Sequence, residues 1–438
     1  MVSMRTGGKI SAAIVVLTDI LDRHQPVKTA MRDWGKSARY AGSKDRAWVS
    51  GLVLDALRKK NSLASRMGDD HPRALVLGAL AFAWGWDIDQ IEAATGDEHG
   101  PDVLTPDERA RLTGAPDAAV PVHVAGDFPE WMTPMMDRVF GADAAAEAQA
   151  MAMRADVDLR VNTLKVDAAK AAVPLKSANA EPSRLLHTAF HIPAKDPSER
   201  EASLESIPAY SKGWVEVQDA GSQIAAAAAN AQPGEQVLDY CSGGGGKTIA
   251  LAAQMNGKGQ IFAYDIDGKR LSALIPRLKR SGATNVQLVH PSEPVQLDTL
   301  TGLMDCVFVD APCTGTGTWR RRPDSKWRVK QGQLEKRMAE QTEILASAAA
   351  FVKPGGRMVY ATCSFLMEED EDRVAEFLST HPEFTEEDAA ATAIASGLLT
   401  DEGANVVQRF RLPTGSVRLT PRRAGTDGFF FAVLRRVG

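Results

Sequence analysis

The chain has 438 residues, of which 44% are hydrophobic and 24% charged, and its formal net charge is −5 at pH 7. This length exceeds one compact core, so we expect two or three domains. The negative balance excludes a protein coated in positive charge, so any contact with nucleic acid must use local basic patches.

All four cysteines, Cys241, Cys306, Cys313 and Cys363, lie in the second half of the chain, without the paired spacing of a zinc site. We therefore expect neither disulfides nor a bound metal, as is usual in a reducing compartment. The apolar run 10–17 follows two basic residues as in a signal peptide, but no small-residue cleavage site comes after it. Because no apolar run approaches the roughly 20 residues of a membrane span, we expect a cytoplasmic protein without a membrane segment.

Residues 1–125 are expected to form a helical domain. The stretch 47–57 places its Val, Leu and Ala side chains on one helical face, between clusters of Lys and Arg. Those basic residues fit a solvated face and an RNA-contacting surface equally well, and the residues alone leave both open. Glycine, proline and aspartate accumulate from 96 to 128 as in a linker, where Thr105-Pro106-Asp107-Glu108 predicts one capped helix.

Residues 126–214 are expected to form a helical linker and a small α+β unit, because 129–155 is rich in Ala and 159–164 alternates like a strand. After Trp214, strands alternate with helices, which is typical of a parallel sheet. We expect residues 215–438 to form an α/β domain. Its predicted strands are 236–241, 260–265, 286–290, 305–310, 357–362 and 428–434, with helices at 268–281 and 333–352.

The first of these strands leads into a glycine-rich loop and a helix, through Cys241-Ser242-Gly243-Gly244-Gly245-Gly246-Lys247-Thr248. Glycines let a ligand approach the backbone, and a helix N-terminus favours a negative ligand group. A P-loop would require Gly at the position of Cys241, so that reading fails. Asp265 ends the next strand, about 20 residues on, where a carboxylate takes ribose hydroxyls. The spacing suits NAD or S-adenosylmethionine and does not choose between them.

Two strands end in an acid or a thiol. Val307-Phe308-Val309-Asp310 runs into Ala311-Pro312-Cys313, and Val359-Tyr360-Ala361-Thr362 runs into Cys363-Ser364. If the two strands are neighbours, both thiols face the ligand crevice, where Lys247 or the run Arg320–Arg322 could activate them. Cys306 lies inside a strand and is expected to be a buried apolar residue.

One type of reaction requires two thiols and an acid close together. A thiolate that adds to C6 of a pyrimidine makes C5 nucleophilic enough to take a methyl group from a sulfonium, and a second group then releases the thiol. Asp310 could bind the N3/N4 edge of cytosine and stabilise the adduct.

The chain resembles the Nop/Sun family of RNA cytosine-C5 methyltransferases, most closely the bacterial Sun/RsmB branch that acts on 16S ribosomal RNA. The resemblance is carried by Asp310–Gly317, Ala361–Ser364, Gly245–Thr248, Thr426–Phe430 and, upstream, Leu159–Leu164 and Gln218–Ser222. It implies a Rossmann-like methyltransferase domain after a NusB-like helical RNA-binding domain.

The resemblance also implies roles for individual residues. Cys363 would be the nucleophile and Cys313 would assist release, whereas DNA cytosine methylases attack with the Pro-Cys cysteine. S-adenosylmethionine would lie along Cys241–Lys247, with Asp265 on its ribose and Asp310 near its methionine end. RNA contacts are expected from Arg160, Asn162, Arg320, Arg321, Lys326 and Trp327.

Two positions depart from the family pattern: Gly244 stands where Pro is usual, and His290-Pro291-Ser292-Glu293 lacks the usual acid for the adenine. The expected partner is ribosomal RNA or a small-subunit precursor, bound by a monomer. The alternatives are a catalytically silent RNA-binding or assembly factor on the same fold, or methylation of another RNA such as tRNA.

Overall fold

The computed structural model of the protein describes residues 4–115, 119–196, 198–199 and 207–438. The chain divides into two compact units, each formed by three segments that are separated in the sequence. Unit one consists of Met1–Arg154, Ala194–Ala202 and Trp319–Val329, and unit two of Ala155–Pro193, Ser203–Thr318 and Lys330–Gly438.

Unit one is helical, as expected for the first part of the chain. Its core is built from the apolar faces of the helices, with Ile10, Leu17, Leu52 and Leu57 almost wholly buried. The predicted capped helix is confirmed: Thr105 and Glu108 exchange side-chain and backbone hydrogen bonds at its start. The helices of unit one are α1 (Thr6–Leu21), α2 (Val27–Ser37), α3 (Ser43–Arg58), α4 (Lys60–Met67), α5 (Pro72–Phe82), α6 (Ile88–Ala94), α7 (Pro106–Thr113), α8 (Val122–Ala125), η1 (Glu130–Met132), α9 (Thr133–Phe140), η2 (Gly141–Asp143), α10 (Ala144–Met151) and α18 (Pro323–Arg328).

Unit two begins with a small antiparallel sheet in the order β2-β3-β1-β4. The strand predicted at 159–164 is β1, one of the two inner strands, and it ends three residues earlier than expected. The elements of this part are β1 (Val157–Val161), α11 (Ala168–Leu175), η3 (Lys176–Ala178), β2 (Glu181–Pro182), β3 (Ala189–Ile192), α12 (Pro208–Ser211) and β4 (Val215–Val217).

A second, larger sheet of eight strands carries the rest of unit two. Its order is β10-β12-β9-β8-β5-β6-β7, with β11 paired to β12, and β5 to β9 run parallel. All six predicted strands are present, and each begins and ends within five residues of the expected positions. Strands are β5 (Gln236–Asp239), β6 (Gln260–Tyr264), β7 (Val286–Val289), β8 (Met304–Asp310), β9 (Val352–Thr362), β10 (Phe384–Glu387), β11 (Val417–Leu419) and β12 (Phe429–Arg436). Helices are α13 (Ala220–Ala227), α14 (Gly246–Gln254), α15 (Gly268–Ser272), α16 (Leu274–Ser281), α17 (Pro294–Asp298), η5 (Thr316–Thr318), α19 (Gln331–Ala349), α20 (Glu371–Thr380), α21 (Ala389–Ala395), α22 (Asp401–Arg409) and α23 (Pro421–Ala424).

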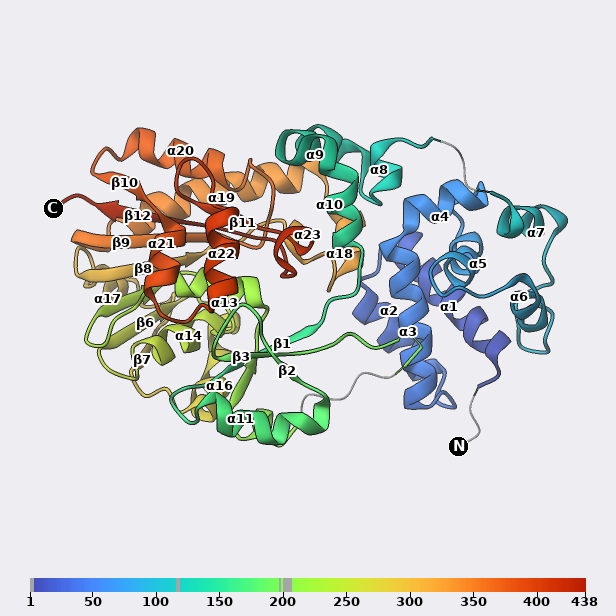
Figure 1. Ribbon diagram of the computed structural model, residues 1–438, viewed down its shortest axis with the longest axis horizontal. Coiled ribbons are helices and arrows are strands. Elements are labelled where there is room, and N and C mark those ends of the chain that lie inside the picture. Colours follow the sequence, from blue (N-terminus) through green and yellow to red (C-terminus); the bar gives the residue numbers. More distant parts are fainter. Residues whose placement is uncertain (1–3, 116–118, 197, 200–206) are drawn as a thin grey trace. The chain divides into compact units, whose positions relative to one another are not determined.

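Helices cover both faces of the large sheet (Figure 1). Alternate residues of β8 show why: Cys306 and Phe308 pack with α13, α14 and α21, whereas Val307 and Val309 pack with α19 and α20. Residues 306–309 of β8 are all apolar because both faces of the strand are buried. Strand order reverses between β5 and β8, and the carboxyl ends of strands at such a point are where α/β sheets bind ligands. Among the described residues, no helix has both the length and the apolar character of a membrane span.

Candidate active site

The two thiols predicted at neighbouring strand ends lie in contact. β8 and β9 pair in parallel, with Asp310 opposite Ala361, so the segments that follow leave the sheet side by side. The Sγ atoms of Cys313 and Cys363 are 3.4 Å apart, and both thiols are free. The hydrogen bond with Cys363, together with burial, raises the pKa of the Cys313 thiol.

A buried carboxylate that the sequence analysis did not single out fixes the Cys313 loop. Glu369 accepts hydrogen bonds from the backbone nitrogen of Thr314 at 2.7 Å and from its Oγ1 at 2.5 Å. Gln341 of α19 donates to the same carboxylate at 3.2 Å and to the carbonyl of Pro312 at 2.9 Å. Its one sequence signal is a run of five acidic residues, 368–372, placed soon after Cys363.

Lys247 and Asp310 form an ion pair beside the thiol loops. Their Nζ and Oδ2 atoms are 2.7 Å apart, and the Lys247 side chain is 7% exposed while that of Asp310 is 35% exposed. The ammonium also lies 5.2 Å from the centre of the Phe429 ring. The pair therefore places a carboxylate, held by a buried cation, at the open end of β8.

The glycine loop follows β5, as predicted. Gly243 and Gly245 have φ of +50° and +78°, and a Cβ on Gly245 would stand 1.9 Å from a Leu274 carbon. Asp265 at the end of β6 is buried and accepts from the Gly243 nitrogen at 2.8 Å. Burial raises the pKa of Cys241, so this thiol stays protonated within the loop.

Three aspartates and two cations surround this loop. Burial, the largest cause, together with Asp310 and Asp265 raises the pKa of Asp239 to about 7, so this group is only partly ionised at neutral pH. Lys247 pairs with Asp310 at 2.7 Å, and an Arg270 nitrogen lies 3.9 Å from an Asp265 oxygen. The Asp265 and Asp310 carboxylates therefore each have a basic partner.

The residues expected to contact RNA are placed elsewhere. Asn162 is fully buried and donates to the carbonyls of Gly213 at 2.9 Å and Ser281 at 2.7 Å. Arg160 is also buried, with hydrogen bonds to Gln218 and Gly246. These contacts hold unit two together, so the RNA contact expected of both residues stays a prediction.

The other four expected RNA contacts lie in the 319–329 segment, which packs within unit one. Lys326 is 1% exposed and donates to the carbonyl of Arg58 at 2.9 Å, and Trp327 donates to that of Leu57 at 2.7 Å. Both thus satisfy carbonyls at the end of α3, which a helix leaves unpaired. Arg320 is buried and its carbonyl accepts from Arg58 at 2.9 Å, and Arg321 is half-buried.

The chain is similar to known methyltransferases. Residues 226–435 match the family described as 16S rRNA methyltransferase RsmB/F. The probable ribosomal RNA small subunit methyltransferase B of Synechocystis is 29% identical over 70% of this chain and 67% of its own length. The ribosomal RNA small subunit methyltransferase B of Yersinia pseudotuberculosis is 33% identical over 60% of this chain and 61% of its own length.

One solved structure matches the fold over nearly the whole chain. The crystal structure of PH0851 superposes with a TM-score of 0.72 and 25% identity, and covers 99% of this chain and 100% of PH0851. The curated relatives are matched over about two thirds of their length or less. Residues 226–435, just under half of the chain, are therefore similar to the RsmB/F methyltransferases.

Proposed function

We propose that this protein methylates carbon-5 of a cytosine in 16S ribosomal RNA through a covalent adduct between Cys363 and C6 of the base, with Cys313 assisting release. One observation carries the proposal: two free thiols lie 3.4 Å apart at the ends of adjacent parallel strands. A protein that only binds RNA needs neither thiol nor the buried network that positions them. The names of the relatives favour small-subunit ribosomal RNA over tRNA.

In this reaction the Cys363 thiolate adds to C6, and the electrons of the C5–C6 double bond move to C5. C5 then takes the methyl group. The Cys313 thiolate removes the C5 proton, which restores the double bond and breaks the Sγ–C6 bond, so that Cys363 leaves as a thiolate. Asp310, fixed by Lys247, binds the N3/N4 edge and stabilises the adduct more than the free base.

The methyl donor would be held along Cys241–Lys247, with Asp265 on its ribose and Asp310 near its methionine end. When bound, S-adenosylmethionine supplies an electrophilic methyl group on a sulfonium. The residues fit it on two grounds: the loop backbone stays accessible because Gly243 and Gly245 adopt positive φ, and the Asp310 carboxylate, which is 35% exposed, can face a cationic group.

The remaining assignments belong to the same proposal. Residues 1–125 would be a NusB-like RNA-binding domain, 126–214 a linker with a small RNA-binding α+β unit, and 215–438 the catalytic domain. Arg320 and Arg321 are proposed to contact RNA, and the protein to act as a monomer in the cytoplasm.

The test is a trapping experiment with single cysteine variants, S-adenosylmethionine and small-subunit RNA, resolved on a denaturing gel. Cys313→Ala is expected to accumulate a covalent protein–RNA band, because the adduct forms and cannot be released. Cys363→Ala is expected to give no band and no methylation, with donor affinity unchanged. Cys306→Ala is the matched control, since this thiol is buried inside β8. A band with Cys363→Ala alone would reverse the two roles, and methylation by Cys363→Ala at the wild-type rate would refute the mechanism.

A further inference from the structure

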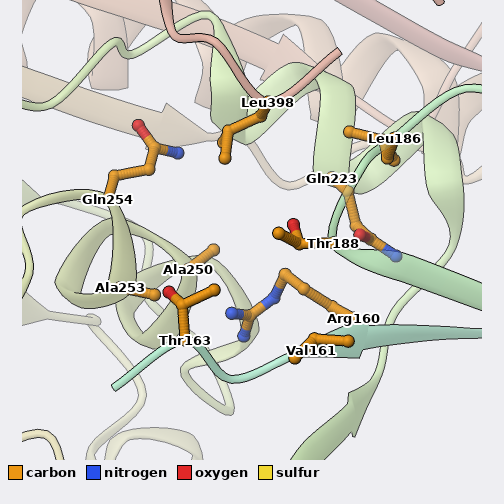
Figure 2. A pocket seen from close by; sticks show the side chains of 10 residues that line it. All are labelled: Arg160, Val161, Thr163, Leu186, Thr188, Gln223, Ala250, Ala253, Gln254 and Leu398. Atoms are coloured by element: carbon orange, nitrogen blue, oxygen red, sulfur yellow. The ribbon is translucent and has the colours of Figure 1, made fainter. Parts of the chain in front are cut away.

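Unit two contains a small cavity between β1, the loop before β3, and the outer side of α14. Its volume is about 40 Å³, and Arg160, Thr163, Thr188, Ala250 and Ala253 are among the residues that line it. Figure 2 shows the Arg160 guanidinium at the cavity, with Thr163 and Ala250 nearby. At roughly 10–15 Å³ for each water-sized group, the cavity has room for about three such groups.

The Arg160 guanidinium is only partly satisfied by the protein. Arg160 is 6% exposed, and its Nε donates to Gln218 at 2.6 Å and its Nη2 to the carbonyl of Gly246 at 3.5 Å. Its Nη1 is buried and has no hydrogen-bond partner among the described residues. Burial lowers the pKa of Arg160 to about 10, so the group is still charged at neutral pH. A buried, charged N–H group without an acceptor destabilises the fold, and a ligand that supplies the acceptor removes this cost.

The charged side chains around Arg160 carry more positive than negative charge. Glu216 is the acid that interacts with Arg160, and it is already engaged by Arg277 at 2.9 Å and Arg280 at 2.5 Å. Three guanidinium groups therefore share one carboxylate.

The cavity wall itself offers donors and no acid. Thr163, which is exposed, and Thr188, which is half-buried, add hydroxyl groups whose oxygen atoms have no hydrogen-bond partner in the described part of the chain, and none of the ten lining residues is acidic. A buried guanidinium beside two hydroxyl groups that make no hydrogen bond to the protein is the donor set of an oxyanion site.

We propose that this cavity binds one phosphate group, through Nη1 of Arg160 and the hydroxyls of Thr163 and Thr188. The room available suits the oxygens of a single phosphate and excludes a base or a ribose. A phosphate of the RNA backbone and free inorganic phosphate share this chemistry. RNA as the source rests on the proposed function, and the phosphate site itself does not.

The test titrates the full chain with inorganic phosphate by calorimetry at constant ionic strength. One site is expected for the wild type. Arg160→Gln, which removes the charge, and Ala253→Leu, which fills the cavity and leaves Arg160 intact, should each weaken phosphate binding by at least about tenfold. Thr284→Val, an exposed threonine outside the cavity, should bind phosphate as the wild type does. No phosphate binding by the wild type, or equal binding by Ala253→Leu, would overturn the site.

A second arm measures binding of a single-stranded fragment of small-subunit RNA at several salt concentrations. Arg160→Gln should lower the slope of log K against log salt by about 0.7, as loss of one phosphate contact does. An unchanged slope and RNA affinity, with phosphate binding lost, would overturn RNA as the source and leave free phosphate as the ligand. Neither arm requires turnover, so failure of methylation in the trapping experiment is a separate result.

Discussion

Removal of the Glu369 carboxylate should slow the release of the methylated base more than its formation. Glu369 holds Thr314, the residue after Cys313, through two hydrogen bonds, and its Oε1 also accepts from Gln341. Glu369→Ala leaves the amide and hydroxyl of Thr314 without their acceptor, in a region where Glu369 itself is fully buried. The loop carrying Cys313 then loses its anchor, while Cys363, on the end of β9, keeps its place.

The magnitude follows from the two contacts to Thr314. A buried donor left without its acceptor costs about 1–3 kcal/mol, so the loss of both contacts costs about 2–6 kcal/mol of loop stability. If only about 2 kcal/mol of this loss is added to the activation free energy of release, because the Cys313 thiol is out of position, release slows about 30-fold. Glu369 is also one cause of the raised pKa of Cys313, so its removal lowers that pKa.

The assay is single-turnover methylation followed by the decay of the covalent adduct. Glu369→Ala should form the adduct at near the wild-type rate and then accumulate it, and Glu369→Gln should shift the pH dependence of release toward lower pH with a smaller loss of rate. Glu343→Ala, an exposed acid on α19, is the matched control. Adduct decay at the wild-type rate in Glu369→Ala would refute the positioning role.

Three further predictions concern stability and the cofactor loop. Burial raises the pKa of Asp239 to about 7, so its ionisation destabilises the native state as pH rises from about 4 to 7; Asp239→Asn should remove up to about 4 kcal/mol of this loss in urea melts. Burial lowers the pKa of Lys326 to about 7, so stability should rise between pH 7 and about 10, and Lys326→Met should abolish that rise. Gly245→Ala should lose methyl-donor binding in calorimetry, because its Cβ meets Leu274 at a positive φ. Gly244→Ala should bind normally, because its Cβ would only make an ordinary contact of 3.4 Å with Arg277 Nη1.

The thiol pair could be predicted from sequence because the signals that place it are local. Each strand is an apolar run that ends in a thiol loop, and a parallel sheet brings such loops to one edge. The structure confirms that β8 and β9 are neighbours and that Cys306, inside β8, is buried. Glu369 could not be predicted in the same way, since its importance depends on Thr314, 55 residues earlier in the chain.

The RNA contact expected of Arg160 and Asn162 came from the family resemblance, and alternation at 159–164 predicted only a strand. β1 is one of the two inner strands of its sheet, and contacts from Gln218, Gly246 and Ser281 cover Arg160 and Asn162. Alternation identifies a strand and does not show which polar residues reach solvent.

The basic segment 319–329 also contains residues whose partners could not be predicted from the local sequence. Its lysine and tryptophan were predicted beside RNA because of their composition and their place in the sequence. In the structure, Lys326 and Trp327 close the end of α3, about 270 residues away in the chain. A cation near the last carbonyls of a helix interacts favourably with the helix dipole. A basic residue can therefore contact RNA or close the end of a helix, and the sequence around it does not show which partner it has.

The contact between the two thiols also bears on how their proposed roles are divided. Two sulfur atoms 3.4 Å apart share one hydrogen bond, so ionisation of one thiol is stabilised by the S–H group of the other. The hydrogen bond with Cys363, burial and Glu369 all hold the proton on Cys313. This matches the proposed order of roles, in which Cys363 attacks C6 first and Cys313 acts later. In the proposed reaction, a Cys363 sulfur bonded to the base would no longer share a hydrogen bond with Cys313, and that cause of the raised Cys313 pKa would be lost when Cys313 is needed as the base that completes release.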